Sequence, residues 1–362
     1  MKKIYFTVTN DLNLDQRMHR ICTSLAENNY AVTLVGRELP GSLPLSPKKY
    51  SQHRLHCWFK KGKLFYVEFN FRLSLFLLLK KMDAVCAIDL DTIHPCWLVS
   101  WLKNIPRIYD AHELFTEMKE VISRPAIKRL WDKAEKKMVP KFKLGYTVSN
   151  GIADEFHKRY GVQYEVIRNV PVLLNEEPVS TTEKFILYQG AVNEGRAFES
   201  LIPAMKTVKC KLVICGDGNF MPQLKKLVAE NGVSDKIEIK GWTKPEELRR
   251  ITQQALMGIA ISEKEGLNQW LALPNKFFDY LHAGIPQIAM NFPEYREINK
   301  QYEVAVLLDN TFPGTVSAAI NSLIQDEEKR NRITRNCHAA KQELNWQREE
   351  KKLLAFYKKV FE

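Results

Sequence analysis

The sequence contains no apolar run long enough to cross a membrane. Its best candidate, Leu64–Leu79, is interrupted by a Glu, an Asn and an Arg. The purely apolar part, Leu75–Leu79, is far shorter than the roughly 20 residues that a bilayer requires. We therefore predict a strand over Leu64–Glu68, followed by a helix.

Cysteine pairs with metal or redox spacing are also missing. None of the seven cysteines forms a Cys-x-x-Cys pair, and Cys86 and Cys215 lie in apolar runs, where a free thiol behaves as a small apolar group. The apolar run before Asn10 is shorter than the core of a signal peptide. We expect a reducing compartment and a cytoplasmic location, and peripheral attachment to the inner face of the membrane stays open.

Acidic residues are scarce in the first half of the chain. Residues 1–170 hold 28 Lys and Arg against 17 Asp and Glu, whereas residues 171–344 hold 21 against 22. A basic half suits nucleic acid, an acidic substrate or an anionic membrane surface. No aromatic-rich binding module or recognition helix accompanies the charge, so we expect no nucleic-acid partner.

The most basic segment spans residues 124–143, with eight basic side chains against Asp132 and Glu135. Its apolar residues follow helical spacing: Ile127, Leu130, Trp131, Ala134 and Met138. The helix can lie on an anionic membrane or pack on its own sheet with solvated lysines. We expect the apolar face to pack on the sheet and the charges to attract a membrane.

The chain is too long for one ordinary core and suits two domains, which we place at residues 1–170 and 171–344. Short apolar runs alternate with helical patterns, as in α/β folds with parallel sheets. A helix over residues 16–28 follows Asp15 as N-cap, residues 37–62 form a loop, and residues 169–182 form a linker. The predicted strands are 4–9, 31–35, 64–68, 84–88, 107–109, 144–148 and 165–167, then 185–189, 211–215, 236–240, 256–261, 286–289 and 304–308.

Ligands of open parallel sheets bind beyond the carboxyl ends of the strands. In the first half these positions carry charged groups, which suit hydroxyl-rich substrates and proton transfer: Asp15, Arg17, Asp89, Asp91, Asp110, His112 and Glu113. In the second half they carry glycines, which let the backbone approach a phosphate or nucleoside closely: Gly190, Gly216 and Gly218, with Trp242 nearby.

The segment Leu273–Pro286 predicts a short helix aimed at a ligand. A proline suits its start, and a glycine followed two residues later by proline stops it. Asn275, Lys276 and Asp279 fall in its first two turns, where free N–H groups favour an anion.

Several motifs follow one another along the chain: Asp-Gln-Arg at 15–17, Asp-Leu-Asp-Thr at 89–92, Tyr-Asp-Ala-His-Glu at 109–113, Tyr-Gln-Gly at 188–190, Gly-Asp-Gly at 216–218 and Leu-Pro-Asn-Lys-Phe-Phe-Asp-Tyr at 273–280. In this order they resemble the retaining GT-B glycosyltransferases of the family-four group, especially its bacterial branch with a Pro-Asn-Lys motif. The resemblance implies two Rossmann-like domains whose parallel sheets face a cleft. It also implies an acceptor on the first domain, a nucleotide sugar on the second, a final helix over 345–362 that crosses back to the first, and neither metal nor cofactor.

The resemblance also implies roles for single residues. Asp279 matches an acidic residue that contacts the donor ribose, whereas the position expected to contact the transferred sugar is Leu271, for which Glu263 or Glu265 could substitute. Of two cationic positions near the phosphates, one is Ala191 and the other Arg196, so Lys276 is our candidate replacement. The implied catalytic residues are His112, Arg196 and Lys276; the donor-binding residues are Gly190, Asn193, Gly216, Gly218, Trp242, Pro274, Asn275 and Asp279; the acceptor-binding residues are Asp15, Arg17, Asp89, Asp91, Asp110 and Glu113.

Simpler structural roles compete with these assignments. Asp89 and Asp91 are expected first as caps of the helix that follows them. Asn275 can cap its own helix, Lys276 can be solvated, and the glycines at 216 and 218 can form an ordinary turn. Asp279 is harder to explain in this way, because a buried carboxylate needs a partner.

These features predict a glycosyltransferase that moves a sugar from a nucleoside diphosphate sugar to a glycan or lipid-linked acceptor in cell-surface polysaccharide synthesis, with retention. Two alternatives remain. One is a GT-B nucleotide-sugar epimerase, which needs no acceptor. The other is a non-catalytic nucleotide-sugar-binding protein, which Leu271 and Ala191 would permit.

Overall fold

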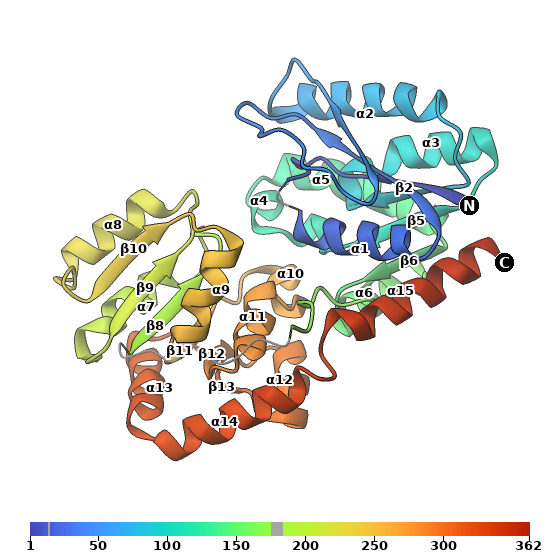
Figure 1. Cartoon of the computed structure of the whole chain (residues 1–362). Coiled ribbons are helices and arrows are strands. Elements are labelled where there is room, and N and C mark those ends of the chain that lie inside the picture. Colours follow the sequence, from blue (N-terminus) through green and yellow to red (C-terminus); the bar gives the residue numbers. More distant parts are fainter. Residues whose placement is uncertain (14, 175–183) are drawn as a thin grey trace. The chain divides into compact units, whose positions relative to one another are not determined.

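The computed structural model describes residues 1–13, 15–174 and 184–362 (Figure 1). The chain forms two compact units. The first contains Met1–Asn169 with Gly266–Asn268 and Glu349–Glu362, and the second contains Val170–Glu265 and Gln269–Arg348. Most of the linker predicted at residues 169–182 lies outside the described residues. No helix in the described ranges is long and apolar enough to span a membrane.

The first unit is built on a parallel sheet with strand order β3-β2-β1-β4-β5-β6-β7. Its strands are β1 (Lys2–Thr7), β2 (Tyr30–Arg37), β3 (Ser51–Leu55), β4 (Ala84–Ile88), β5 (Arg107–Ala111), β6 (Leu144–Thr147) and β7 (Glu165–Val166). Ile4 of β1 lies opposite Val32 of β2 and Ala84 of β4, so the strand order reverses between β1 and β4. Ligands of such sheets bind beside this point, at the carboxyl ends of the strands.

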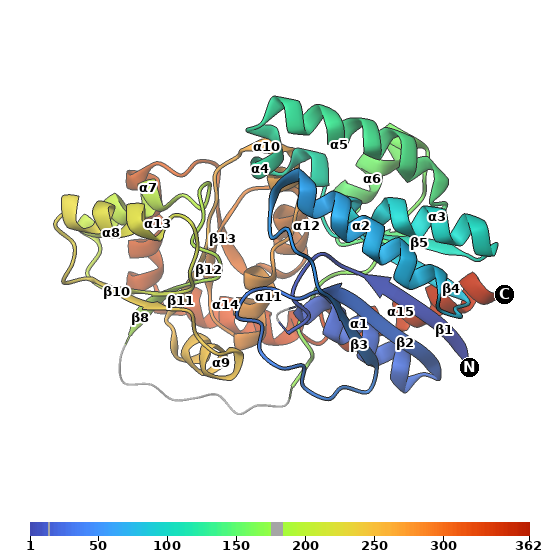
Figure 2. The same cartoon turned by 90° about the horizontal axis from the view of Figure 1, so that it is seen from above.

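Helices cover both faces of this sheet. The longer ones are α1 (Gln16–Glu27), α2 (Gly62–Leu78), α3 (Ile93–Lys103), α5 (Pro125–Met138), α6 (Asn150–Tyr160) and α15 (Trp346–Phe361), with a short α4 (Lys119–Ile122). The helices α2 and α3 lie side by side on one face, and α1 and α15 lie on the other (Figure 1; Figure 2). The predicted cap of α1 is confirmed, because the Asp15 carboxylate accepts a hydrogen bond from the Met18 N–H at 3.0 Å.

The last helix, α15, packs on the first unit. Its Tyr357 ring lies 6.0 Å from the ring of Phe6 and 6.3 Å from that of Tyr146, measured between centroids. Its Glu349 carboxylate accepts a hydrogen bond from the Arg168 N–H at 3.0 Å. The end of the chain thus contributes aromatic side chains to the core of the first unit.

Two local predictions for the first unit are wrong. Residues 64–68, predicted as a strand, belong to α2, whose buried side chains Phe65 and Phe69 follow helical spacing. The outer face of α2 is also apolar, which hides the helical period in the sequence. Residues 37–62, predicted as loop, contain β3, an edge strand whose polar sequence Ser-Gln-His-Arg-Leu lacks an apolar alternation.

The second unit repeats the same topology with strand order β10-β9-β8-β11-β12-β13, all parallel. The strands are β8 (Phe185–Gln189), β9 (Lys211–Cys215), β10 (Ile237–Gly241), β11 (Met257–Ala260), β12 (Gln287–Met290) and β13 (Ala305–Leu308). The helices are α7 (Phe198–Ala204), α8 (Met221–Glu230), α9 (Pro245–Gln254), α11 (Asn275–Ala283), α12 (Pro293–Tyr302), α13 (Pro313–Gln325) and α14 (Glu327–Ala340). The short helix α10 (Gly266–Leu271) is divided between the two units after Asn268. All six predicted strands are confirmed, with ends shifted by at most one residue.

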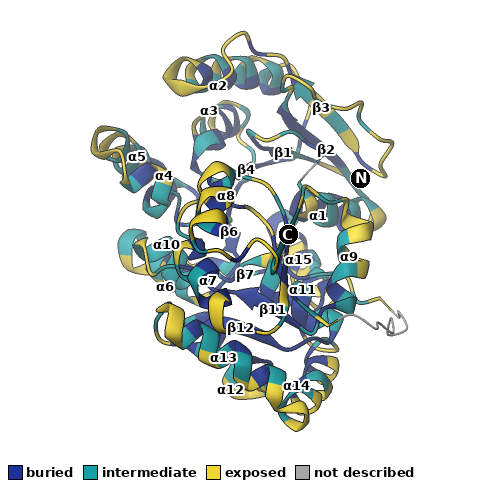
Figure 3. Ribbon diagram, turned by 90° about the vertical axis from the view of Figure 1, so that its left-hand side faces the viewer, coloured by how far each residue is buried: buried dark blue, intermediate teal, exposed yellow. Residues whose placement is uncertain are grey.

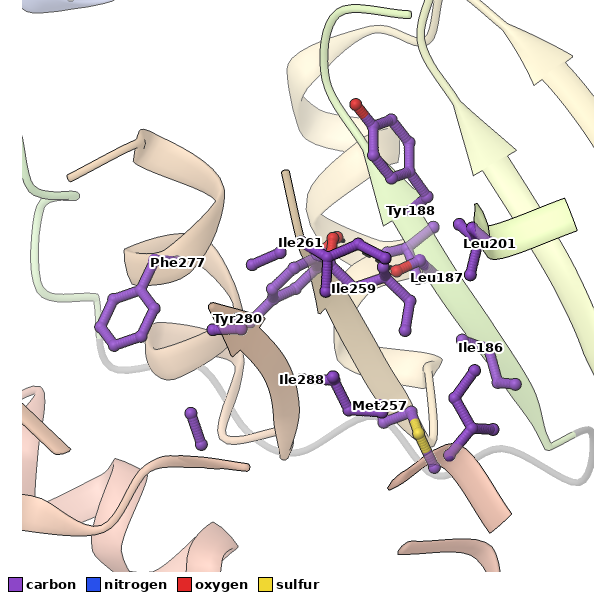
Figure 4. Close-up of a cluster of buried hydrophobic side chains, with 14 of the residues drawn as sticks. Ile186, Leu187, Tyr188, Leu201, Met257, Ile259, Ile261, Phe277, Tyr280 and Ile288 are labelled. Carbon is purple, nitrogen blue, oxygen red and sulfur yellow. Dashed lines mark hydrogen bonds between the residues drawn. The ribbon is translucent and has the colours of Figure 1, made fainter. Parts of the chain in front are cut away.

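The core of the second unit fixes α11 against the point where its strand order reverses, between β8 and β11. Figure 4 shows the Tyr280 ring reaching from α11 toward these two strands. A Cβ atom at Gly258 of β11 would lie 2.4 Å from that ring, so glycine is required there. The Tyr280 hydroxyl donates to the Leu187 carbonyl and accepts from the Gln189 N–H, each at 3.1 Å. These bonds set the position of α11 relative to the end of β8.

Candidate functional site

In the first unit, Asp89 and His112 form a pair at the ends of β4 and β5. Asp89 has a backbone φ of 56°, and its Oδ1 accepts a hydrogen bond from the His112 N–H at 3.0 Å. Its Oδ2 lies 3.6 Å from His112 Nδ1. The carboxylate makes no capping bond to the following 3-10 turn, Leu90–Thr92, so the capping interpretation of Asp89 is wrong.

The charge of His112 depends on this pairing. Burial opposes the charged imidazolium, but the Asp89 carboxylate favours it and raises the pKa of His112 to about 9. His112 is therefore a cation near neutral pH and a hydrogen-bond donor rather than a base. Its Nε2 is buried and has no hydrogen-bond partner in the described part of the chain. An oxygen of a bound substrate could accept that hydrogen bond.

Asp91 lies two residues after Asp89, in the 3-10 turn that follows β4. The Thr9 hydroxyl, after β1, donates a hydrogen bond to its carboxylate. Burial and the nearby Asp89 charge outweigh this bond and raise the pKa of Asp91 to about 7. A carboxyl group with this pKa can exchange a proton near neutral pH. The helix α3 has no side-chain cap, so Asp91 does not cap it either.

The other predicted acceptor residues are placed differently. Arg17 and Asp110 form an ion pair at 2.8 Å between side chains that are 2% and 0% exposed. Arg17 also donates to the Ile167 carbonyl at 3.1 Å, so the pair joins α1, β5 and the end of β7. Asp15 caps α1, and Glu113 is partly buried. Arg17 and Asp110 are therefore buried and stabilise the ends of these strands.

In the second unit, Lys276 lies at the carboxyl end of β8. Its Nζ is 3.8 Å from the centroid of the Tyr188 ring, and a Cβ atom added to Gly190 would lie 3.7 Å from that Nζ. Within the described residues, Nζ forms neither a hydrogen bond nor an ion pair. Burial and the positive charge of Arg196 lower the pKa of Lys276 well below its usual range. Lys276 is thus partly buried and packs on the Tyr188 ring.

Arg196 is the second cation of this site. It lies in the loop between β8 and α7. Its charge helps to lower the pKa of Lys276, and it opposes the rise that burial causes in the pKa of Tyr188. In the described ranges its guanidinium also lacks a carboxylate partner. Asp279 is the acidic side chain whose charge acts on Lys276, and neither cation forms an ion pair within the described residues. Two neighbouring cations of this kind favour an anionic ligand.

Asp279 belongs to a polar chain that the sequence did not reveal. Its Oδ2 accepts a hydrogen bond from Gln189 Nε2 at 2.9 Å, and Gln189 Oε1 accepts from the Thr252 hydroxyl at 2.7 Å. Gln189 is the last residue of β8 and is buried. A polar residue that ends a buried apolar strand was the only sequence signal for this role. The amide holds Asp279 in a fixed orientation at the first turns of α11.

The glycines after β9 serve packing between loops. A Cβ atom on Gly216 would lie 1.8 Å from the Gly190 carbonyl oxygen, and one on Gly218 would lie 2.3 Å from the Val192 carbonyl oxygen. The Val192 N–H donates to the Asp217 carbonyl at 3.0 Å, and Asn193 Oδ1 accepts from the Asn219 N–H at 3.2 Å. These contacts hold the Gly190–Asn193 loop beside Lys276, so the glycines shape the site through the backbone.

The remaining predicted donor-binding residues lie near the carboxyl end of β8 or after the neighbouring strands of the same sheet. Trp242, after β10, is exposed, and Gly241 before it has a φ of 71°. Pro274 is the N-cap of α11 without a side-chain cap bond, and Asn275 is its exposed first residue. Leu271 ends α10 and is partly buried, whereas the Glu263 N–H donates to the Gly195 carbonyl at 3.0 Å, next to Arg196. The described residues contain no cluster of three or more His, Cys, Asp or Glu that could hold a metal ion.

Each half of the chain matches a known protein family. Residues 15–171 match the family described as Glycosyltransferase Family 4, and residues 172–339 match Glycosyl transferases group 1. Both matched families are glycosyltransferases, and the fold is that of GT-B glycosyltransferase structures. Comparison with curated proteins gives no match.

Solved structures show the same fold over the whole chain. Sucrose-phosphate synthase from Thermosynechococcus elongatus is 16% identical, with 100% of this chain and 99% of that one covered and a TM-score of 0.86. Anabaena HepE in complex with UDP-glucose is 12% identical, with coverages of 99% and 100% and a TM-score of 0.75. A Staphylococcus aureus TarM variant, in complex with fondaparinux, α-GlcNAc-glycerol and UDP, is 11% identical, with full coverage of both chains and a TM-score of 0.74.

Proposed function

We propose that this glycosyltransferase moves a sugar from a nucleoside diphosphate sugar to a glycan or lipid-linked acceptor in cell-surface polysaccharide synthesis, with retention. The observation that carries the proposal is the pair of cations at the end of β8, Lys276 and Arg196, neither of which forms an ion pair among the described residues. A diphosphate supplies the missing negative charge. The complexes of HepE with UDP-glucose and of TarM with UDP support this choice of ligand.

The second unit is the proposed donor-binding unit. Lys276 and Arg196 bind the diphosphate and stabilise the charge that grows on it as the glycosidic bond breaks. Asp279 binds the ribose hydroxyls. Its carboxylate is oriented by the hydrogen bond from Gln189 Nε2, and a carboxylate accepts hydrogen bonds from hydroxyl groups.

The first unit is the proposed acceptor-binding unit. His112 donates a hydrogen bond from Nε2 to a sugar hydroxyl, and Asp89 keeps the imidazolium charged and oriented. Asp91 can accept a proton near neutral pH from the acceptor hydroxyl. Retention would follow if the acceptor hydroxyl attacks the sugar on the same face from which the diphosphate departs. Lys276 and Arg196 would stabilise the negative charge of the diphosphate on that face.

One observation favours the non-catalytic alternative. Leu271 stands where an acidic contact to the transferred sugar is expected, and a leucine offers no hydrogen bond to a hydroxyl. A protein that only binds nucleotide sugars would keep Lys276, Arg196 and Asp279 but would release no product.

Acceptor-dependent release of nucleoside diphosphate separates these functions. A transferase releases the diphosphate only when donor and acceptor are both present. An epimerase interconverts the donor sugar without an acceptor, and a binding protein does neither. Release with acceptor, abolished in Arg196→Ala, supports transfer, whereas conversion of the donor alone would overturn it. Cell fractionation tests the proposed cytoplasmic location with peripheral attachment to the inner face of the membrane.

A further inference from the structure

The helix α2 is apolar on both of its faces. Its inner face buries Phe65, Phe69, Leu73 and Leu77 against the first unit. Its outer face carries a second apolar row, spaced by three or four residues, that is exposed: Leu64, Val67, Phe71, Leu75 and Leu79. Phe71 has 63% of its surface exposed. Exposed residues are marked along α2 in Figure 3. A contiguous exposed apolar row of this kind marks a surface that binds another phase or molecule.

The neighbouring helix extends this apolar surface. Trp101 and Leu102, at the end of α3, are both exposed. Lys103 Nζ donates to the Leu78 carbonyl at 2.9 Å and to the Lys80 carbonyl at 3.1 Å, which ties the end of α3 to the end of α2. The α2 face is defined here as the exposed row on α2 together with Trp101 and Leu102, and the hydrogen bonds of Lys103 join its two helices.

Basic side chains frame this face, and its one acidic side chain is neutralised. Between residues 60 and 81 the basic residues are Lys60, Lys61, Lys63, Arg72, Lys80 and Lys81, against Glu68 alone. The Glu68 carboxylate accepts hydrogen bonds from the Trp58 and Phe59 N–H groups, each at 2.9 Å, and pairs with Arg72 at 2.8 Å. The lysines therefore stand at both ends of an apolar row with no free acid between them.

We propose that the α2 face docks on an anionic lipid bilayer, with the apolar row below the headgroups and the lysines on the lipid phosphates. A helix with one apolar face and flanking basic residues lies in the plane of a membrane interface in this way. A second copy of the chain fits less well, because a symmetric contact would bring the same lysines together. The α2 face is thus the surface through which the peripheral membrane attachment would occur.

This surface differs from the basic helix that the sequence suggested for the membrane. On α5 only Glu135 and Met138 are buried, and Leu130 is the one large apolar residue of this helix that is classed as exposed in the described structure. The apolar contact with lipid is therefore assigned to α2 rather than to α5.

Vesicle flotation of the whole chain tests the proposal without donor or acceptor, so its failure is distinct from a failure of sugar transfer. We expect the protein to float with vesicles of phosphatidylcholine and phosphatidylglycerol but not with phosphatidylcholine alone. The variant Phe71→Ser with Leu75→Ser should weaken binding at least about tenfold, because two apolar side chains no longer enter the lipid. Lys80→Glu with Lys81→Glu should weaken binding most at low salt.

Matched controls keep the result interpretable. Phe312→Ser, at an equally exposed phenylalanine in the second unit, should bind like the wild type. The melting temperatures of all variants should agree, because the changed side chains are on the surface. Three results would overturn the proposal: no binding to anionic vesicles, unchanged binding of the Phe71 and Leu75 double variant, or loss of binding in Leu130→Ser only. A change of molar mass in light scattering with that double variant would instead assign the face to a second copy.

Discussion

The ammonium group of Lys276 lies 3.8 Å from the centroid of the Tyr188 ring, in a site where burial and Arg196 lower its pKa. The ring face attracts a cation but cannot neutralise it. An anion that enters this site therefore gains the attraction of two cations and relieves their mutual repulsion. This relationship makes the end of β8 the centre of the proposed donor site.

Nucleotide binding should depend on pH through Lys276. Only the protonated amine attracts a diphosphate, so affinity should fall as the pH rises through the lowered pKa of Lys276. Lys276→Arg should remove this step, because arginine stays protonated at every accessible pH. Calorimetric titrations of a nucleoside diphosphate across a pH series measure the effect. A wild type and a Lys276→Arg variant with the same pH profile would contradict it.

Replacement of Gly216 should destabilise the second unit. In Gly216→Ala the new Cβ would lie 1.8 Å from the Gly190 carbonyl oxygen, at a residue whose φ is 154°. We expect a loss of about 2–4 kcal/mol in the free energy of unfolding. Gly314→Ala is the matched control, because its Cβ meets no atom within 4 Å and alanine favours the helix. Equal midpoints of urea unfolding for the two variants would argue against the loop packing described above.

The buried pair of Arg17 and Asp110 should make the first unit sensitive to loss of either partner. Arg17→Met leaves the Asp110 carboxylate buried and unpaired, which should cost about 3–5 kcal/mol. The double variant Arg17→Met with Asp110→Leu removes the isolated charge and should regain part of this loss. Urea unfolding measures both values. A double variant no more stable than Arg17→Met would contradict the claim that the isolated Asp110 charge causes the loss.

Asp89→Asn should lower the pKa of His112. Without the Asp89 carboxylate, burial and Arg17 oppose the imidazolium and the weaker effect of Asp110 remains in its favour, so the pKa should fall from about 9 toward its usual value near 6.5 or below it. A raised pKa of His112 contributes stability that is fully present below about pH 6.5 and is lost as the pH rises through about 9. In the Asp89→Asn variant, the free energy of unfolding should no longer fall between about pH 6.5 and pH 9 through His112. NMR titration of the His112 ring tests the shift, and an unchanged titration curve would contradict the pairing.

The sequence allowed the strands of the second unit to be predicted within one residue, because buried parallel strands are short apolar runs between turn residues. The same rule failed for residues 64–68. There the helix α2 is apolar on two faces, so its period disappears. It failed again for β3, an edge strand whose sequence Ser-Gln-His-Arg-Leu is polar in four of five positions.

For the site, the sequence indicated which residues end the strands but not how they pair. Asp89 was predicted as a cap, yet its carboxylate holds His112, a contact between residues 23 positions apart. Gln189 was missed, because its partners Thr252 and Asp279 are far away in the sequence. Such pairings depend on tertiary packing, which no local pattern encodes.

The most direct test of the proposed donor site is calorimetric titration with UDP, GDP, ADP and TDP of four proteins: the wild type, Lys276→Ala, Arg196→Ala and the control Lys225→Ala, whose side chain is exposed on α8. We predict that the wild type and Lys225→Ala bind at least one nucleotide equally well. Each of the other two variants should bind it about tenfold to a hundredfold more weakly, as expected for the loss of a charge-assisted hydrogen bond. Undiminished binding in both Lys276→Ala and Arg196→Ala would contradict the account.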